Sequence, residues 1–104
     1  MIIEFRKEGD RQLCTQQGVA RVSFGIANEK KLLKVITTLN GSITLWDLKA
    51  THPKAHWLDG DRLWQVSVPL ADGKRLIIEP LEYVTREWNK IIAVRFIEIT
   101  DYHK

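Results

Sequence analysis

Residues 63–80, "LWQVSVPLADGKRLIIEP", contain two short apolar segments on either side of a turn signal. The first segment, "LWQVSV", alternates apolar and polar residues with a period of two, which is typical of a half-buried strand. Pro69 ends this segment, and the dipeptide Asp72-Gly73 strongly favours a turn. The second segment, "KRLIIEP", returns as a strand and ends at Pro80. The stretch therefore predicts two antiparallel strands joined by a turn.

Upstream of this hairpin, apolar residues recur at spacings of three, four and occasionally more, as in an amphipathic helix. They are Val19, Val22, Ile26, Leu32, Leu33, Ile36 and Leu39. We expect Asn40-Gly41 to end this helix, because both residues tolerate the left-handed conformation of many helix ends. Ser42 is then expected to cap a second, short helix at residues 43–50. Residues 1–5, "MIIEF", predict a short opening strand.

The remaining segments complete the predicted fold. The polar residues 8–17 are compatible with a helix, and residues 81–89 predict a long exposed connection. Residues 90–103, "KIIAVRFIEITDYH", predict the last and longest strand. Helices followed by strands with short turns indicate an α+β fold, a compact antiparallel sheet with N-terminal helices packed on one face. Residues 1–104 are predicted to form a single domain.

The composition is typical of a globular protein and does not by itself indicate a function. Of 104 residues, 44% are hydrophobic, and 16 Lys and Arg against 13 Asp and Glu leave a formal charge of +3. This modest basic excess is compatible with a nucleic-acid or ribosome partner, and also with none. No apolar segment approaches the ~20 residues of a membrane helix, and the start lacks a signal peptide. The single cysteine, Cys14, fits a reducing cytoplasm.

The candidates for chemistry favour reactions that need no metal or cofactor. Pro53 separates His52 from His56 and disfavours one helix that would align them, and the zinc motifs with paired Cys or His are absent. Metal-free RNA cleavage needs groups that transfer protons and cations that bind the phosphate. Histidine suits the first role and arginine the second. The candidates are His56, Arg75, Tyr102 and His103, although each taken singly is also compatible with a solvated surface residue.

Three segments carry a resemblance to a known family. They are "AHWLDGDRLWQVSV", "KRLIIEP" and "IIAVRFIEITDYHK", and "LWDLKATHP" upstream agrees with them. The pattern of His-x-Leu-x-Gly-Asp, an arginine-led apolar strand and a closing Asp-Tyr-His resembles the HigB-like killer toxins of the RelE/ParE superfamily. The resemblance spans about residues 18–104.

The resemblance implies a RelE-like fold and an activity. Members of this kind are metal-independent endoribonucleases that cleave messenger RNA on the ribosome and are silenced by a helix-turn-helix antitoxin, here HigA-like. By position, His56 matches a catalytic histidine and Arg75 the phosphate-binding arginine. Tyr102 and His103 match the terminal Tyr-His pair of the family. The implied partners are therefore the ribosome with its mRNA and the antitoxin, in the cytoplasm, with no cofactor and no membrane.

One position departs from the family pattern. Many ribosome-dependent members have a lysine three residues after the first histidine, and Asp59 stands there in this sequence. A carboxylate repels a phosphate, so another cation has to supply the charge. Lys54 and Arg62 are the candidates for this role, and Lys74 is a further candidate for RNA binding.

Two other functions stay open at the level of sequence. A toxin of the same fold can act by binding a protein such as DNA gyrase, as ParE-like members do, and Asp59 favours that interpretation. The other is a small basic binding module or a decayed toxin, in which the pair Tyr102-His103 is only structural.

Overall fold

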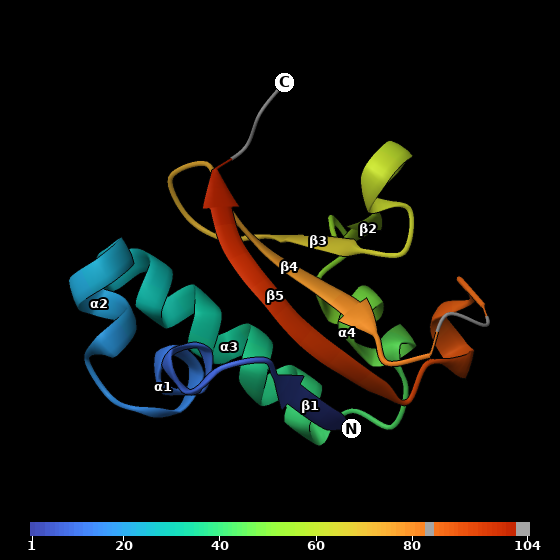
Figure 1. Ribbon diagram of the computed structural model, residues 1–104, viewed down its shortest axis with the longest axis horizontal. Helices are drawn as coiled ribbons and strands as arrows, with labels where there is room; N and C mark the ends of the chain where they lie inside the picture. Colours follow the sequence, from blue (N-terminus) through green and yellow to red (C-terminus); the bar gives the residue numbers. More distant parts are fainter. Residues whose placement is uncertain (83–84, 102–104) are drawn as a thin grey trace.

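The computed structural model describes residues 1–82 and 85–101, in which helices cover one face of a five-stranded sheet (Figure 1). The elements are β1 (Ile2–Phe5), α1 (Glu8–Thr15), α2 (Val19–Phe24), α3 (Ile26–Gly41), α4 (Leu45–Thr51), β2 (His56–Trp57), η1 (Gly60–Arg62), β3 (Val66–Pro69), β4 (Lys74–Pro80), η2 (Trp88–Lys90) and β5 (Ala93–Asp101). The predicted α+β class, with N-terminal helices packed on one face of the sheet, is confirmed. None of the helices in the described residues is long and apolar enough to cross a membrane.

The sheet is mixed rather than antiparallel, which corrects the prediction from sequence. Its strand order is β1-β5-β4-β3-β2, and the pairs β2–β3, β3–β4 and β4–β5 are antiparallel as expected. β1 pairs with β5 in the parallel direction, with Ile3 beside Val94. These two strands lie at opposite ends of the chain, so no tight turn imposes an antiparallel direction on them.

The predicted helix over residues 18–39 is divided into α2 and α3. Gly25 lies between them with φ of +87°, a left-handed value that interrupts an α-helix. Because the chain changes direction at this glycine, part of the predicted apolar stripe is not in the core. Val22 is 89% exposed and Ile26 is 51% exposed, whereas Leu32 is buried.

The boundary between α3 and α4 also differs from the prediction. α3 ends at Gly41, and the Ser42 hydroxyl donates to the Thr38 carbonyl at 2.6 Å, which satisfies a carbonyl of the last turn. Ser42 is thus occupied at the end of α3 and is not the cap of α4. Thr44 is that cap, within a capping box in which the Asp47 carboxylate accepts the backbone N–H of Thr44 at 3.3 Å.

The hydrophobic core lies between α3, α4 and the sheet. Its fully buried side chains include Leu32, Val35, Leu39, Leu45 and Leu48 from the helices and Val66, Val68, Leu76, Ile78, Val94 and Phe96 from the strands. The strand residues alternate along β3 and β4, so every second side chain points toward the helices. The side chains between them point to the opposite face of the sheet.

β3 and β5 are shorter than predicted, and the connection between β4 and β5 is more structured. β3 begins at Val66, and β5 begins at Ala93 because residues 88–90 form η2. The connection at residues 81–89 is not simply exposed. Trp88 is half-buried against Trp57, with ring centroids 5.4 Å apart. The predicted continuation of β5 beyond Asp101 lies outside the described residues.

Candidate functional site

The face of the sheet opposite the helices, here called the open face, carries one row of paired residues across four strands. His56 in β2 pairs with Ser67 in β3, Ser67 with Ile77 in β4, and Ile77 with Glu98 in β5. Directly paired residues share a face of a sheet, and their chain neighbours in β3 and β4 point into the core. The two central residues are fully buried, whereas His56 is exposed and Glu98 half-buried.

Arg75 belongs to the same face as His56. It lies two residues before Ile77 in β4, and it pairs with Thr100 of β5. Two strand spacings across the sheet and two residues along it place the Cα atoms of His56 and Arg75 about 12 Å apart. Both side chains are long enough to approach a phosphate that lies between them. The register therefore brings together two candidates that are 19 positions apart in the sequence.

A β-bulge in β5 determines which residues reach the open face. Ile78 pairs with Phe96 and Ile77 with Glu98, so Ile97 is an extra residue in β5. Without it, Glu98 would follow the alternation of Phe96 and point toward the helices. The reasoning from sequence missed Glu98. The signal that could have found it is the break in alternation at "FIEI", where two apolar residues precede the glutamate.

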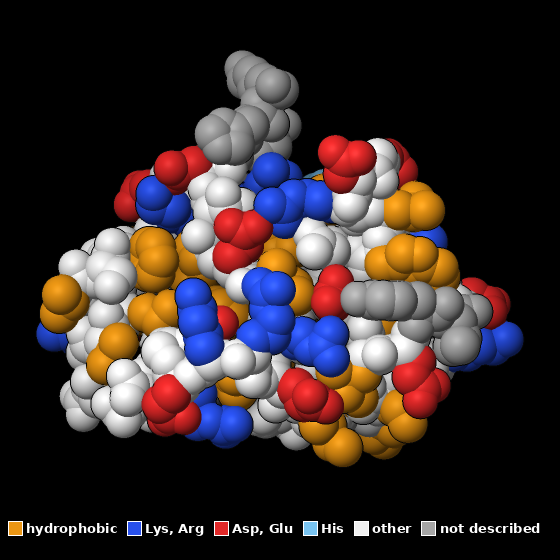
Figure 2. All heavy atoms as spheres, in the orientation of Figure 1, with side chains coloured by type: hydrophobic (Ala, Val, Ile, Leu, Met, Phe, Trp, Pro, Cys, Tyr) orange, Lys and Arg blue, Asp and Glu red, His pale blue; other side chains and the backbone are white. Residues whose placement is uncertain are grey.

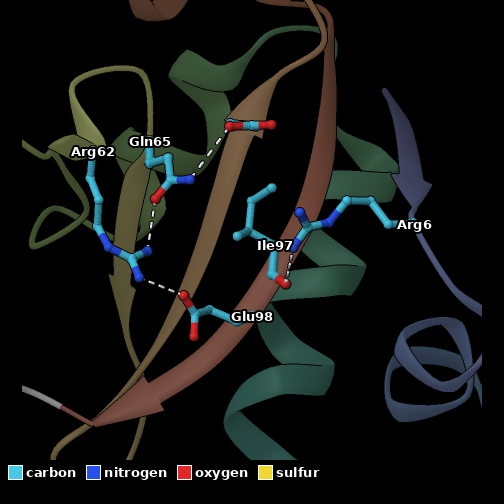
Figure 3. Close-up of polar contacts among 6 residues, drawn as sticks. Arg6, Arg62, Gln65, Ile97 and Glu98 are labelled. Carbon is cyan, nitrogen blue, oxygen red and sulfur yellow. Dashed lines mark hydrogen bonds and ion pairs between the residues drawn. The ribbon is translucent and has the colours of Figure 1, made fainter.

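Arg62 lies across the open face and is held by two acceptors (Figure 3). Its Nη2 donates to Glu98 Oε2 at 2.6 Å, and its Nη1 donates to Gln65 Oε1 at 2.8 Å. The side chains of Arg62 and Glu98 are 43% and 40% exposed. An ion pair this exposed contributes only about 0–1 kcal/mol, so an incoming phosphate can replace Glu98 at little cost.

Two other arginines on the open face are also held by hydrogen-bond acceptors. Arg95 Nη1 donates to Glu79 Oε1 at 3.2 Å, and Arg6 Nη2 donates to the carbonyl of the bulge residue Ile97 at 3.2 Å (Figure 3). Figure 2 looks onto the open face and shows Lys and Arg side chains gathered over its centre, with Asp and Glu side chains between them. The face is therefore cationic in places and partly neutralised by carboxylates.

A backbone hydrogen bond orients the ring of His56. Its Nδ1 lies 3.0 Å from the carbonyl oxygen of Lys54. A carbonyl only accepts, so this contact requires a proton on Nδ1, and Nε2 of the neutral ring then carries the lone pair. His56 can therefore accept a proton at Nε2, or donate one there once the ring is charged.

Two cationic side chains fix the segments on either side of β2. Lys49 Nζ donates to the carbonyls of Pro53 and Ala55, both at 2.7 Å. Arg86 Nη2 donates to the carbonyl of Leu58 at 3.1 Å. Sequence reasoning missed both residues, because neither contact follows from the local pattern.

The other predicted residues are not all brought to the open face. Lys54 and Asp59 are exposed near β2, and Asp59 precedes η1 without a capping hydrogen bond from its side chain. Lys74 is next to Arg75 in β4, so it points to the opposite face, where it forms an ion pair with Asp101. The predicted catalytic residues Tyr102 and His103 lie outside the described residues.

Within residues 1–82 and 85–101, no three His, Cys, Asp or Glu side chains are grouped so that they could hold a metal ion.

No protein-family model matches the sequence, and no curated protein matches it with significance. Membership of the HigB-like toxins therefore stays a proposal.

Proposed function

We propose that the protein is a toxin of a type II toxin–antitoxin system, a metal-independent endoribonuclease that cleaves ribosome-bound mRNA and blocks translation. The observation that carries the proposal is the register, which gives His56 and Arg75 one face of the sheet. Arg62 lies over the same face. A base, a fork-shaped cation and a second cation on one open surface are the groups that this reaction needs.

The reaction follows from these groups. A base takes the proton of a ribose 2′-hydroxyl, and the 2′-oxygen attacks the adjacent phosphorus. The bond from phosphorus to the 5′-oxygen breaks, and an acid returns a proton to that oxygen. The products are a 2′,3′-cyclic phosphate and a 5′-hydroxyl. Arg75 binds the phosphate bidentately and stabilises the charge of the phosphorane, while His56 transfers a proton through Nε2.

The remaining parts of the proposal come from the resemblance. Tyr102 and His103 contribute to proton transfer, and Lys54 and Arg62 bind RNA outside the scissile phosphate. Arg62 exchanges Glu98 for a phosphate of the message, which compensates for the carboxylate of Asp59. The protein acts in the cytoplasm and associates with a HigA-like helix-turn-helix antitoxin.

A second candidate function is supported by the carboxylates of the open face. Glu79 and Glu98 neutralise Arg95 and Arg62, and Asp59 adds a further negative charge near β2. RNA, a polyanion, gains less binding free energy on such a surface than on a purely cationic one. This favours a ParE-like toxin that binds a protein target such as DNA gyrase.

The test is single-turnover cleavage of a defined mRNA by the purified chain, with and without ribosomes. We expect ribosome-dependent cleavage, and a loss of roughly 100-fold or more for Arg75→Ala, since one oxyanion-stabilising contact is worth that much. Arg75→Lys should be intermediate, because it keeps the charge and loses the fork. Arg11→Ala is the matched control, an exposed arginine of α1 that should cleave normally.

The outcomes separate the candidates. Intact mRNA together with inhibited DNA supercoiling would establish the gyrase-directed function instead. A folded Arg75→Ala protein that cleaves at the normal rate would show that the open face is not the site. High expression of the chain alone, without harm to its host, would contradict the toxin function.

A further inference from the structure

A second exposed surface lies on α3, away from the open face. Ile26 and Leu33 are seven residues apart, so they share one face of the helix, with Lys30 between them. Ile26 is 51% exposed and Leu33 is 60% exposed. We call Ile26, Lys30, Leu33 and Lys34 the helix patch. Two exposed aliphatic side chains on one helix face favour an interaction site when a groove adjoins them.

A groove adjoins the helix patch. It has a volume of about 320 Å3 and lies between α1, α2 and α3. Its apolar lining comes from Leu13, Cys14, Leu32 and Leu33, and its polar lining from Thr15, Gln16, Gln17, Arg21, Glu29 and Lys30. Burial raises the pKa of the Cys14 thiol to about 12, and the Asp10 carboxylate adds to the shift. The thiol is therefore neutral at physiological pH, and it contributes to an apolar wall. The groove can accept one apolar side chain of a partner.

The exposed side of α3 beside the groove carries positive charge that no ion pair within the described residues compensates. Lys30, Lys31 and Lys34 are exposed, and none of them forms an ion pair with any residue of 1–82 or 85–101. The acidic residue of α3, Glu29, is already bound to Arg21 at 2.8 Å. Lys30 and Lys34 thus flank the apolar residues of the helix patch, in a chain whose formal net charge is +3.

We infer that the helix patch and its groove bind an acidic amphipathic helix of a partner protein. An apolar side chain of that helix enters the groove, and its carboxylates pair with Lys30 and Lys34. A contact between the helix patches of two copies is disfavoured because it would bring the lysines of both copies together. RNA satisfies the lysines but brings no aliphatic side chain for Leu33. The inference rests on the exposed side of α3 and the groove that α3 forms with α1 and α2, and it does not depend on RNA cleavage.

The experiment measures binding of a labelled 20-residue helical peptide to the full chain by fluorescence anisotropy. The peptide has Leu at every third and fourth position and Glu on the flanking positions. A basic peptide with Lys in place of each Glu, and anionic phosphatidylserine vesicles, are the comparison ligands. We expect the acidic peptide to bind, and its Kd to rise at least tenfold when the salt is raised from 0.1 to 0.5 M.

Variants locate the binding surface. Leu33→Ser, and separately Lys30→Glu with Lys34→Glu, should each raise the Kd at least tenfold, because both changes are on an exposed helix surface and leave the core intact. Ile43→Ser is the matched control, since Ile43 is 81% exposed and lies outside the patch. Failure of the acidic peptide to bind, equal binding of the basic peptide or the vesicles, or an unchanged Kd for Leu33→Ser would each overturn the inference.

Discussion

Replacing Cys14 with alanine removes a thiol that titrates differently in the folded and the unfolded chain. Burial raises the pKa of the folded thiol from 9.0 to about 12, and the Asp10 carboxylate adds to this shift. Between these values the folded state holds a proton that the unfolded state has released. The free energy of unfolding of the wild-type protein therefore falls as the pH rises through this interval.

The size of the effect follows from the two pKa values. Below pH 9 both states hold the proton, and the contribution of the thiol to stability is fully present. At pH 10 the loss in the free energy of unfolding is about 1 kcal/mol, and at pH 11 it is about 3 kcal/mol. The loss is complete above about pH 12, where the folded thiol also ionises.

The assay is urea denaturation of the wild type and of Cys14→Ala at pH 7, 9, 10 and 11. The alanine costs packing energy at every pH, and the lysines titrate in both proteins, so these terms cancel from the comparison. We expect the stability advantage of the wild type over Cys14→Ala to shrink by about 1 kcal/mol between pH 7 and 10 and by about 3 kcal/mol between pH 7 and 11. A difference that stays constant over this range would refute the conclusion that burial holds the thiol neutral.

Four further changes test the fold and the site. Gly25→Ala should cost about 1–2 kcal/mol in urea denaturation, because its φ is +87° while nothing lies within 4 Å of the added Cβ. Gly9→Ala, with ordinary φ and equally open space, is the control and should not destabilise. Lys49→Met should cost about 1–3 kcal/mol by leaving two carbonyls before β2 without their donor. Lys49→Met should also reduce mRNA cleavage more than Gly25→Ala does, because Lys49 positions the segment that carries His56. Equal cleavage by the two variants would show that Lys49 does not position His56. Asp59→Lys should raise single-turnover cleavage about tenfold, or ~1.4 kcal/mol in the barrier, with unchanged thermal unfolding. No gain would indicate that Arg62 already supplies the charge. Truncation after Asp101 should abolish growth arrest with little change in unfolding temperature, and a fully toxic truncated chain would exclude the terminal Tyr-His pair from the site.

The local sequence was sufficient for the α+β class and for most of the elements. In residues 63–80 the alternation of apolar and polar residues and the turn dipeptide Asp72-Gly73 define the β3–β4 hairpin. Both signals depend only on residues that are close in the sequence. The same holds for α3 and for the short helix α4. The predictions at Ser42 and Gly25 were wrong because each residue is compatible with two structural roles, and the local sequence does not decide between them. Ser42 ends one helix instead of starting the next, and Gly25 breaks a stripe that its neighbours would continue.

The tertiary structure decided the direction of β1, the bulge and the membership of the open face. β1 pairs with β5 across nearly the whole chain, so its parallel direction depends on how the helices pack and on no local turn. Residue types indicated His56 and Arg75 as candidates, but only the register places them on one face of the sheet. Glu98 joins them because Ile97 inserts one residue into β5. In a sheet, a shift of one residue reverses which face every following side chain takes, and that choice is made by pairing between distant strands.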